Sequence, residues 1–122
     1  MRRDFSNNPI VKHTIEFSLM LITYVERLEG DRKYVVANQL LKSGTSIGAN
    51  VIEAQTAESK ADFIHKMKIA DKEAHETWYW LYLCEQSENY FFDNVLSSKL
   101  DEISRLLNAI ITSGKGAKKE SA

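Results

Sequence analysis

Apolar residues recur at alternating intervals of four and three along four successive segments of this chain. Such spacing places side chains on one face of an α-helix, whereas a half-buried strand alternates with a period of two. No alternating apolar run is flanked by turn dipeptides, so the chain is predicted to be all-α. The four rows are Ile10, Thr14, Phe17, Leu21, Tyr24 and Leu28; Val36, Leu40, Ser43, Ile47, Val51 and Ala54; Phe63, Met67, Ala70, Ala74, Thr77, Leu81 and Cys84; and Leu96, Leu100, Ile103, Leu107 and Ile110.

Capping residues predict where these helices begin and end. Asn8 precedes Pro9, which is tolerated at a first helical position, and Gly30 marks the end of the first helix. Asp31 is expected to cap the second helix, and Ser59 the third. The predicted helices span about residues 9–29, 32–57, 60–89 and 93–113.

The short connections make consecutive helices antiparallel neighbours, which predicts an up-down-up-down antiparallel four-helix bundle over residues 1–113. A length of 122 residues suits one domain. Residues 114–122 carry lysines but no apolar periodicity, so they are expected to form a flexible basic tail.

Composition and runs of apolar residues favour a cytoplasmic protein with no membrane partner. No apolar run approaches the roughly 20 residues that cross a bilayer. The N-terminus lacks the apolar stretch of a signal peptide. Cys84 is the only cysteine, which excludes an intrachain disulfide, and its apolar neighbours predict a packed thiol.

Two helices carry more apolar surface than a bundle core can cover. In the first, Leu19, Met20 and Ile22 lie outside the buried row. In the third, a run of aromatic residues surrounds the helix. Large uncovered apolar patches mark interfaces, so we expect self-association through these residues. The alternative is that the rings rest on the surface with their hydroxyls in water. The aromatic candidates are Trp78, Tyr79, Trp80 and Tyr82.

A stripe of cationic and histidine residues follows the third helix. It could hold phosphates of RNA or DNA, which an oligomer would repeat. The alternative is a solvated face, because carboxylates are interleaved and the net charge is −1. The candidate nucleic-acid-binding residues are Lys60, His65, Lys66, Lys68, Lys72 and His75.

Polar residues between the second and third helices have an expected structural role. Gly44 and Gly48 are costly inside a helix, which indicates close approach of a neighbouring helix. Asn50 and Glu53 are three apart, as are Glu73 and Glu76, so the two pairs could meet in a polar network.

No arrangement of residues predicts catalysis, a metal site or a cofactor. A di-iron bundle needs Glu-x-x-His on two helices, but the chain offers Asp62-x-x-His65 and the reversed His13-x-x-Glu16. With only three histidines, His13, His65 and His75, no Ser/His/Asp or Cys/His constellation can be nominated. We therefore expect a protein that is not an enzyme, although a metal-dependent bundle enzyme stays a third alternative.

Two motifs carry a resemblance to a known family. Residues 46–53 read Ser-Ile-x-x-Asn-x-x-Glu, and residues 76–81 read Glu-x-x-Tyr-Trp-Leu. Over about residues 10–112 the chain resembles the bacterial four-helix-bundle proteins encoded in intervening sequences of large-subunit ribosomal RNA genes. Those proteins are sometimes labelled ribosomal, and their relatives include the accessory variability protein of diversity-generating retroelements.

This resemblance implies a homopentamer and an RNA- or DNA-binding role. The retroelement relatives are strongly basic, whereas this chain has a net charge of −1. The two functions left open are a pentameric RNA-binding adaptor and a protein-binding or structural module without nucleic acid. The positions carried over as structural are Asn50, Glu53, Glu73, Glu76, Trp80 and Leu81.

Overall fold

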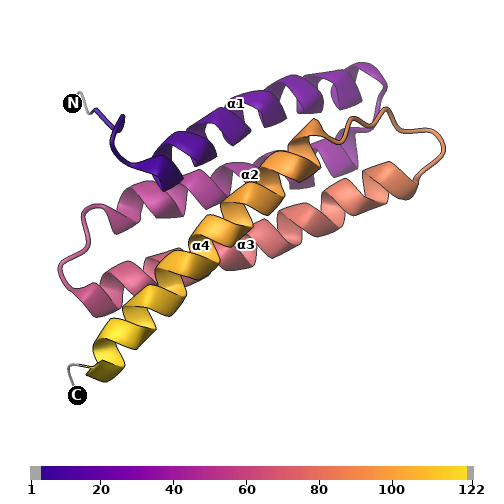
Figure 1. Cartoon of the computed structure of the whole chain (residues 1–122). Helices are drawn as coiled ribbons and strands as arrows, with labels where there is room; N and C mark the ends of the chain where they lie inside the picture. Colours follow the sequence, from indigo (N-terminus) through magenta and orange to yellow (C-terminus); the bar gives the residue numbers. More distant parts are fainter. Residues whose placement is uncertain (1–3, 121–122) are drawn as a thin grey trace.

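The computed structural model describes residues 4–120, and within them the side chains of residues 4–114. Four α-helices and no strand are present in this part of the chain, which confirms the all-α prediction (Figure 1). The helices are α1 (Pro9–Gly30), α2 (Tyr34–Ala54), α3 (Lys60–Gln86) and α4 (Val95–Glu120).

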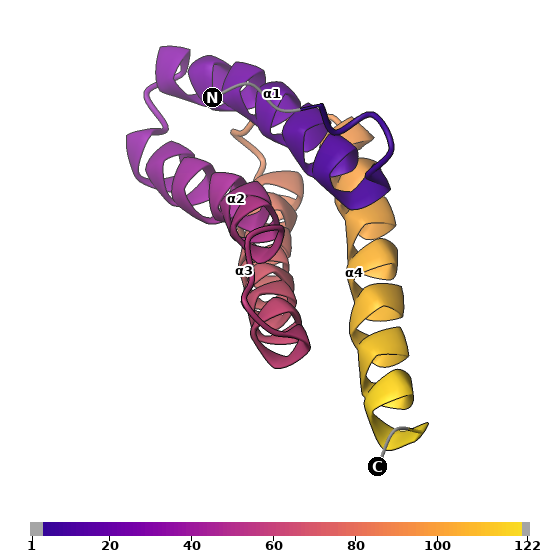
Figure 2. The same ribbon diagram turned by 90° about the vertical axis from the view of Figure 1, so that its left-hand side faces the viewer.

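The helices form the predicted up-down-up-down bundle. Helix α1 packs against α2 and α4, and α3 packs against the same two helices, so α1 and α3 stand at opposite corners. Figures 1 and 2 show α4 running obliquely to the other three helices. The outer faces of α1 and α3 therefore point to opposite sides of the molecule.

The core is built from the four predicted rows. Every member of the first predicted row, Ile10 to Leu28, is buried, and Phe17, Leu21 and Leu28 are completely so. Burying a large aliphatic or aromatic side chain contributes about 1.5–3 kcal/mol, so these rows are a major source of hydrophobic stabilisation. Three row members lie at the edge of the core and are only partly buried: Val36, Phe63 and Ile110.

Two predicted helix caps are confirmed. The Asn8 side chain accepts a hydrogen bond from the Val11 N–H at 3.4 Å, and Pro9 occupies the first turn of α1. The Ser59 hydroxyl accepts from the Asp62 N–H at 3.0 Å. Each cap satisfies a backbone donor that the first helical turn leaves unpaired.

The cap predicted at Asp31 is wrong. Helix α2 begins at Tyr34 after Lys33, whose side chain makes no capping bond. Asp31 closes α1 instead, with its carboxylate 3.1 Å from the Arg27 Nε. The chain reverses through Arg32, which has a φ of 64°, and the Lys33 N–H then donates to the Leu28 carbonyl at 2.8 Å. This left-handed residue delays the start of α2.

The predicted ends of three helices also differ from the structure. Helix α2 stops at Ala54 rather than 57, and α3 stops at Gln86 rather than 89 because Ser87 adopts an extended conformation. Helix α4 runs from Val95 to Glu120, whereas residues 93–113 were predicted. Its backbone stays helical past 113 despite Gly114 and Gly116, in a stretch that has no proline and otherwise contains good helix formers. For the predicted flexible basic tail, 114–122, the side chains after Gly114 and the last two residues lie outside the described part.

Close approach of α1 and α2, which was predicted from both glycines of α2, explains one of them. A Cβ added to Gly44 would collide with the buried Leu21 side chain and touch Phe17. A Cβ on Gly48 would meet Thr14 at an ordinary distance of 3.4 Å. Only Gly44 is therefore required by sterics.

This difference predicts opposite effects of two alanine substitutions. Gly44→Ala should destabilise the fold by about 1–3 kcal/mol, because the completely buried Leu21 side chain would have to repack. Gly48→Ala should leave stability unchanged or raise it by up to about 1 kcal/mol through helix propensity. Urea unfolding of both variants checks this, and equal effects would contradict the packing described here.

Candidate nucleic-acid interface

The candidate nucleic-acid-binding residues of α3 differ in how far they are exposed to solvent. His65, Lys68 and Lys72 are exposed at i, i+3 and i+7, opposite the buried row, and form what we call the basic row. Lys60 is exposed at the start of the helix. Lys66 departs from the prediction: it is half-buried and turns toward α2, where its Nζ lies 3.4 Å from a Glu53 carboxylate oxygen.

His75 is exposed but engaged with its own helix. Its Nδ1 lies 2.8 Å from the Asp71 carbonyl oxygen and 3.8 Å from the Asp71 carboxylate. Lys68 and Lys72 make no side-chain hydrogen bond or ion pair with another described residue. These two ammonium groups are thus the side chains of the basic row best placed to meet phosphates.

The predicted aromatic residues divide among three directions. Trp78 lies toward α4, and its indole stacks on Tyr82 with ring centroids 5.1 Å apart and planes at 17°. Tyr79 points outward, above the end of the basic row, and is 50% exposed. Trp80 is half-buried, with its Nε1–H 3.4 Å from the Glu76 carboxylate and its ring at the edge of Tyr79.

Of the three apolar residues predicted to form a surface on α1, two share an exposed face and the third does not. Leu19 is 62% exposed, and Ile22 is exposed three residues later. Ile15, four residues before Leu19, completes this row; it was not among the predicted interface residues, although its spacing from Leu19 indicates the same face. Met20 is half-buried and packs against the core instead. We call Ile15, Leu19 and Ile22 the α1 row.

The polar network predicted between α2 and α3 does not form. Asn50 donates to the Ser46 carbonyl at 2.8 Å, and Glu53 pairs with Lys66. Because α2 and α3 are antiparallel, Glu53 lies level with Lys66, about two turns from Glu73. These residues therefore do not share an acid–base site.

A different hydrogen bond joins the two helices in the core. The Thr77 hydroxyl donates to the Ser43 hydroxyl at 2.9 Å, and it also lies 2.8 Å from the Glu73 carbonyl oxygen. Both residues are buried. The bond satisfies two buried polar groups and fixes the register of α2 against α3.

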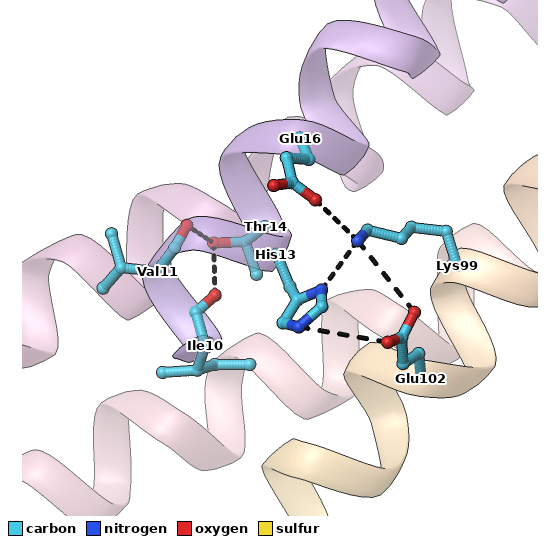
Figure 3. Close-up of polar contacts among 7 residues, drawn as sticks. All are labelled: Ile10, Val11, His13, Thr14, Glu16, Lys99 and Glu102. Atoms are coloured by element: carbon cyan, nitrogen blue, oxygen red, sulfur yellow. Dashed lines mark hydrogen bonds and ion pairs between the residues drawn. The ribbon is translucent and has the colours of Figure 1, made fainter. Parts of the chain in front are cut away.

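An ionic cluster joins α1 to α4 (Figure 3). The Lys99 ammonium lies 2.7 Å from a Glu16 carboxylate oxygen, 2.6 Å from the His13 Nδ1 and 3.9 Å from Glu102. An ammonium can only donate, so the contact with His13 requires an unprotonated Nδ1. The Lys99 hydrogen bond and charge hold the pKa of Glu16 below its ordinary value. This cluster was not predicted, although His13 and Glu16 on α1, and Lys99 and Glu102 on α4, are each spaced i, i+3 in the sequence.

The remaining candidate for chemistry, Cys84, is packed as predicted. The thiol is buried, and desolvation raises its pKa. Burial likewise raises the pKa of Tyr24, whose hydroxyl donates to the Phe91 carbonyl at 2.6 Å. Both groups are therefore protonated at neutral pH and serve packing rather than nucleophilic chemistry.

Neither a metal centre nor a membrane span emerges from the described residues. In that part of the chain, no three histidine, cysteine or acidic side chains gather where they could hold a metal ion. None of its helices combines the length and apolarity that crossing a bilayer requires.

The chain matches one protein-family model and is similar to a solved structure. The family model described as 23S rRNA-intervening sequence protein matches residues 6–109. The chain belongs to this family. Its fold matches the crystal structure of a protein with unknown function from the S23 ribosomal protein family of Bacteroides thetaiotaomicron. That match has 40% sequence identity and a TM-score of 0.79, and it covers 84% of this chain and 97% of the other. No curated protein matches the sequence.

The ionic cluster predicts a pH-dependent contribution from Glu16. A carboxylate with a lowered pKa stabilises the fold above its ordinary pKa of 4.5, and this contribution is lost as the pH falls through the lower value of the folded state. Glu16→Gln should therefore be less stable than the wild type at pH 7, with a smaller difference at pH 3. Urea unfolding at both pH values measures this. Glu26→Gln, which changes an exposed glutamate of the same helix, is the control.

Proposed function

We propose that this family member is a non-enzymatic four-helix bundle that assembles with copies of itself and binds RNA through the basic row of α3. The observation that carries the proposal is the distribution of surface residues. Two exposed apolar surfaces stand at opposite corners of the bundle, and one of them continues into an exposed cationic row.

Self-association is supported by exposed apolar side chains on both corners. The α1 row is one surface, and Tyr79 with Leu83, exposed at i and i+4 on the outer face of α3, is the other. Soluble monomers rarely keep contiguous apolar patches uncovered. Aromatic side chains are enriched at the centres of interfaces.

The position of the two surfaces favours a ring. A two-fold dimer pairs one patch with the same patch, which would leave the second surface exposed. Pairing the α1 row of one copy with α3 of the next covers both and closes when the rotation between copies allows it. The family resemblance implies five copies, so a homopentamer is the assembly that we propose.

A charge placed in the α1 row should disrupt this assembly. Leu19→Glu removes a side chain that the isolated bundle leaves exposed, so helicity should be retained while the solution mass falls toward one chain. Val35→Glu is the matched control, because Val35 is 76% exposed and lies on α2, which carries neither surface. Light scattering measures the mass. A mass unchanged by Leu19→Glu, or a monomeric wild type, would contradict the assembly.

RNA binding is supported by the exposed ammonium groups of Lys68 and Lys72. Their half of α3 precedes the aromatic half, so assembly through Tyr79 leaves them free. A ring repeats the row once per copy and raises the affinity for one strand through multivalency. The net charge of −1 is compatible with this role because the positive charge is local.

The binding should weaken steeply with salt and depend on these two lysines. Neutralised single-strand phosphates contribute about −0.7 each to the salt dependence, so Lys68→Glu with Lys72→Glu should flatten the slope by about one to two for each copy that the strand contacts, and should lower the affinity. Lys12→Glu with Lys42→Glu changes the same charge at exposed positions of α1 and α2. Titration of single-stranded RNA at several salt concentrations measures both. An equal loss of RNA affinity in the two double variants would show that net charge, and not the basic row, determines binding. If the wild type bound no RNA, the alternative of a protein-binding or structural module would be favoured.

A further inference from the structure

A groove with a mainly apolar lining lies between α3 and α4, next to the end of the basic row. It has a volume of about 350 Å³, within the range of sites that hold small ligands. Its base is apolar, whereas its rim carries an imidazole, a carboxylate and a hydroxyl. The lining residues are Ala74, His75, Trp78, Leu100, Asp101 and Ser104.

Trp78 offers one face of its indole ring to this groove. Tyr82, one turn later on α3, stacks against the ring, while Ala74 and His75, one turn earlier, line the groove. The indole face opposite Tyr82 therefore borders the open space. With 51% of the residue exposed, Trp78 is a ready platform for a flat aromatic ligand.

The α4 wall carries hydrogen-bonding groups that no described residue satisfies. Asp101 and Ser104 are spaced i, i+3 and both line the groove. Neither side chain makes a hydrogen bond or ion pair with another residue in the described part of the chain. A carboxylate only accepts hydrogen bonds and has two oxygens, so it suits a ligand edge with two adjacent N–H donors.

Guanine has both required features among the RNA bases. Its flat ring can stack on an indole, and its N1–H and N2–H groups point the same way and can pair with one carboxylate. Adenine presents an acceptor at N1, which would face the carboxylate unfavourably. Stacking on an aromatic side chain and bonding through the pairing edge is how proteins recognise unpaired RNA bases.

The charges around the groove fit a base better than a phosphate. Asp101 repels phosphates from the groove itself. Lys72 lies six residues before Trp78 on α3, about 9 Å along the helix axis, and Lys68 lies one turn further. A strand whose base enters the groove can thus place neighbouring phosphates at the basic row.

We propose that this groove binds one unpaired guanine of an RNA strand, stacked on Trp78 and hydrogen-bonded to Asp101. This inference rests on the proposed RNA binding and adds to it the identity of a base. It also assigns Trp78 to the ligand rather than to the contact between copies.

The test follows Trp78 fluorescence in the Trp80→Phe background, which leaves Trp78 as the only tryptophan. The probes are short uridine oligonucleotides with a central guanosine, adenosine or abasic nucleotide. We expect quenching and about tenfold tighter binding with guanosine than with either alternative, since a good bidentate contact or a stacked base corresponds to about 1–3 kcal/mol.

Two substitutions separate the contributions of the groove. Asp101→Asn should abolish the preference for guanosine over adenosine, whereas Glu85→Gln, at an exposed acidic position of α3, should keep it. Trp78→Ala, made with Trp80 intact and followed by anisotropy of labelled RNA, should lower the affinity for guanosine to that for the abasic probe without changing the solution mass.

The outcomes distinguish the groove from the basic row. Equal binding of the three probes, with the Lys68→Glu and Lys72→Glu loss intact, would overturn the guanine site and leave RNA binding standing. A change of solution mass in Trp78→Ala would place Trp78 between copies and also overturn the site. Absence of RNA binding by every probe would remove both proposals.

Discussion

Burial of one apolar row from each helix in a common core is the constraint on which this structure depends. Short connections allow four such rows to meet only when neighbours in sequence are neighbours in space, with the first and last helices closing the circle. Gly44 lets α1 and α2 approach across the Leu21 side chain, and the Ser43–Thr77 hydrogen bond fixes α2 against α3. The corners occupied by α1 and α3 follow from this order.

The same constraint determines which side chains remain for function. Several polar groups have partners within the bundle: Glu53 pairs with Lys66, Glu76 contacts Trp80, and Lys99 joins α1 to α4. The outer faces of α1 and α3 have no such internal use. Their apolar and cationic residues, together with the groove beside Trp78, are therefore where the described surface offers contacts to other molecules.

Much of the fold was predictable because it rests on local periodicity. The apolar rows, the caps at Asn8 and Ser59, and the role of Gly44 need only spacing and helix geometry. The predicted cap at Asp31 was wrong because such a side chain can also end the preceding helix. The left-handed conformation of Arg32 could not be predicted from the sequence. The end of α4 was missed because loss of apolar periodicity was taken for loss of helix.

The candidate site was less predictable because it depends on register and direction. The stripe on α3 was visible in the spacing, but whether Lys66 or Trp78 points to a neighbouring helix depends on where that helix lies. Asn50 and Glu53 were expected to meet Glu73 and Glu76, and only the antiparallel register shows that Glu53 lies about two turns from Glu73. Asp101 was unremarkable in the sequence and gains significance from the groove that it lines.

The contact between α1 and α4 has a consequence for how the chain folds. The other three helix pairs are hairpins that close short loops, whereas this pair joins the two ends of the chain and bears the largest loop-closure entropy. We therefore expect the hairpins to form first and the seam around Lys99 to close last. By the same reasoning, local opening of the native bundle should begin there, with α4 separating from α1 while the Thr77–Ser43 pairing persists.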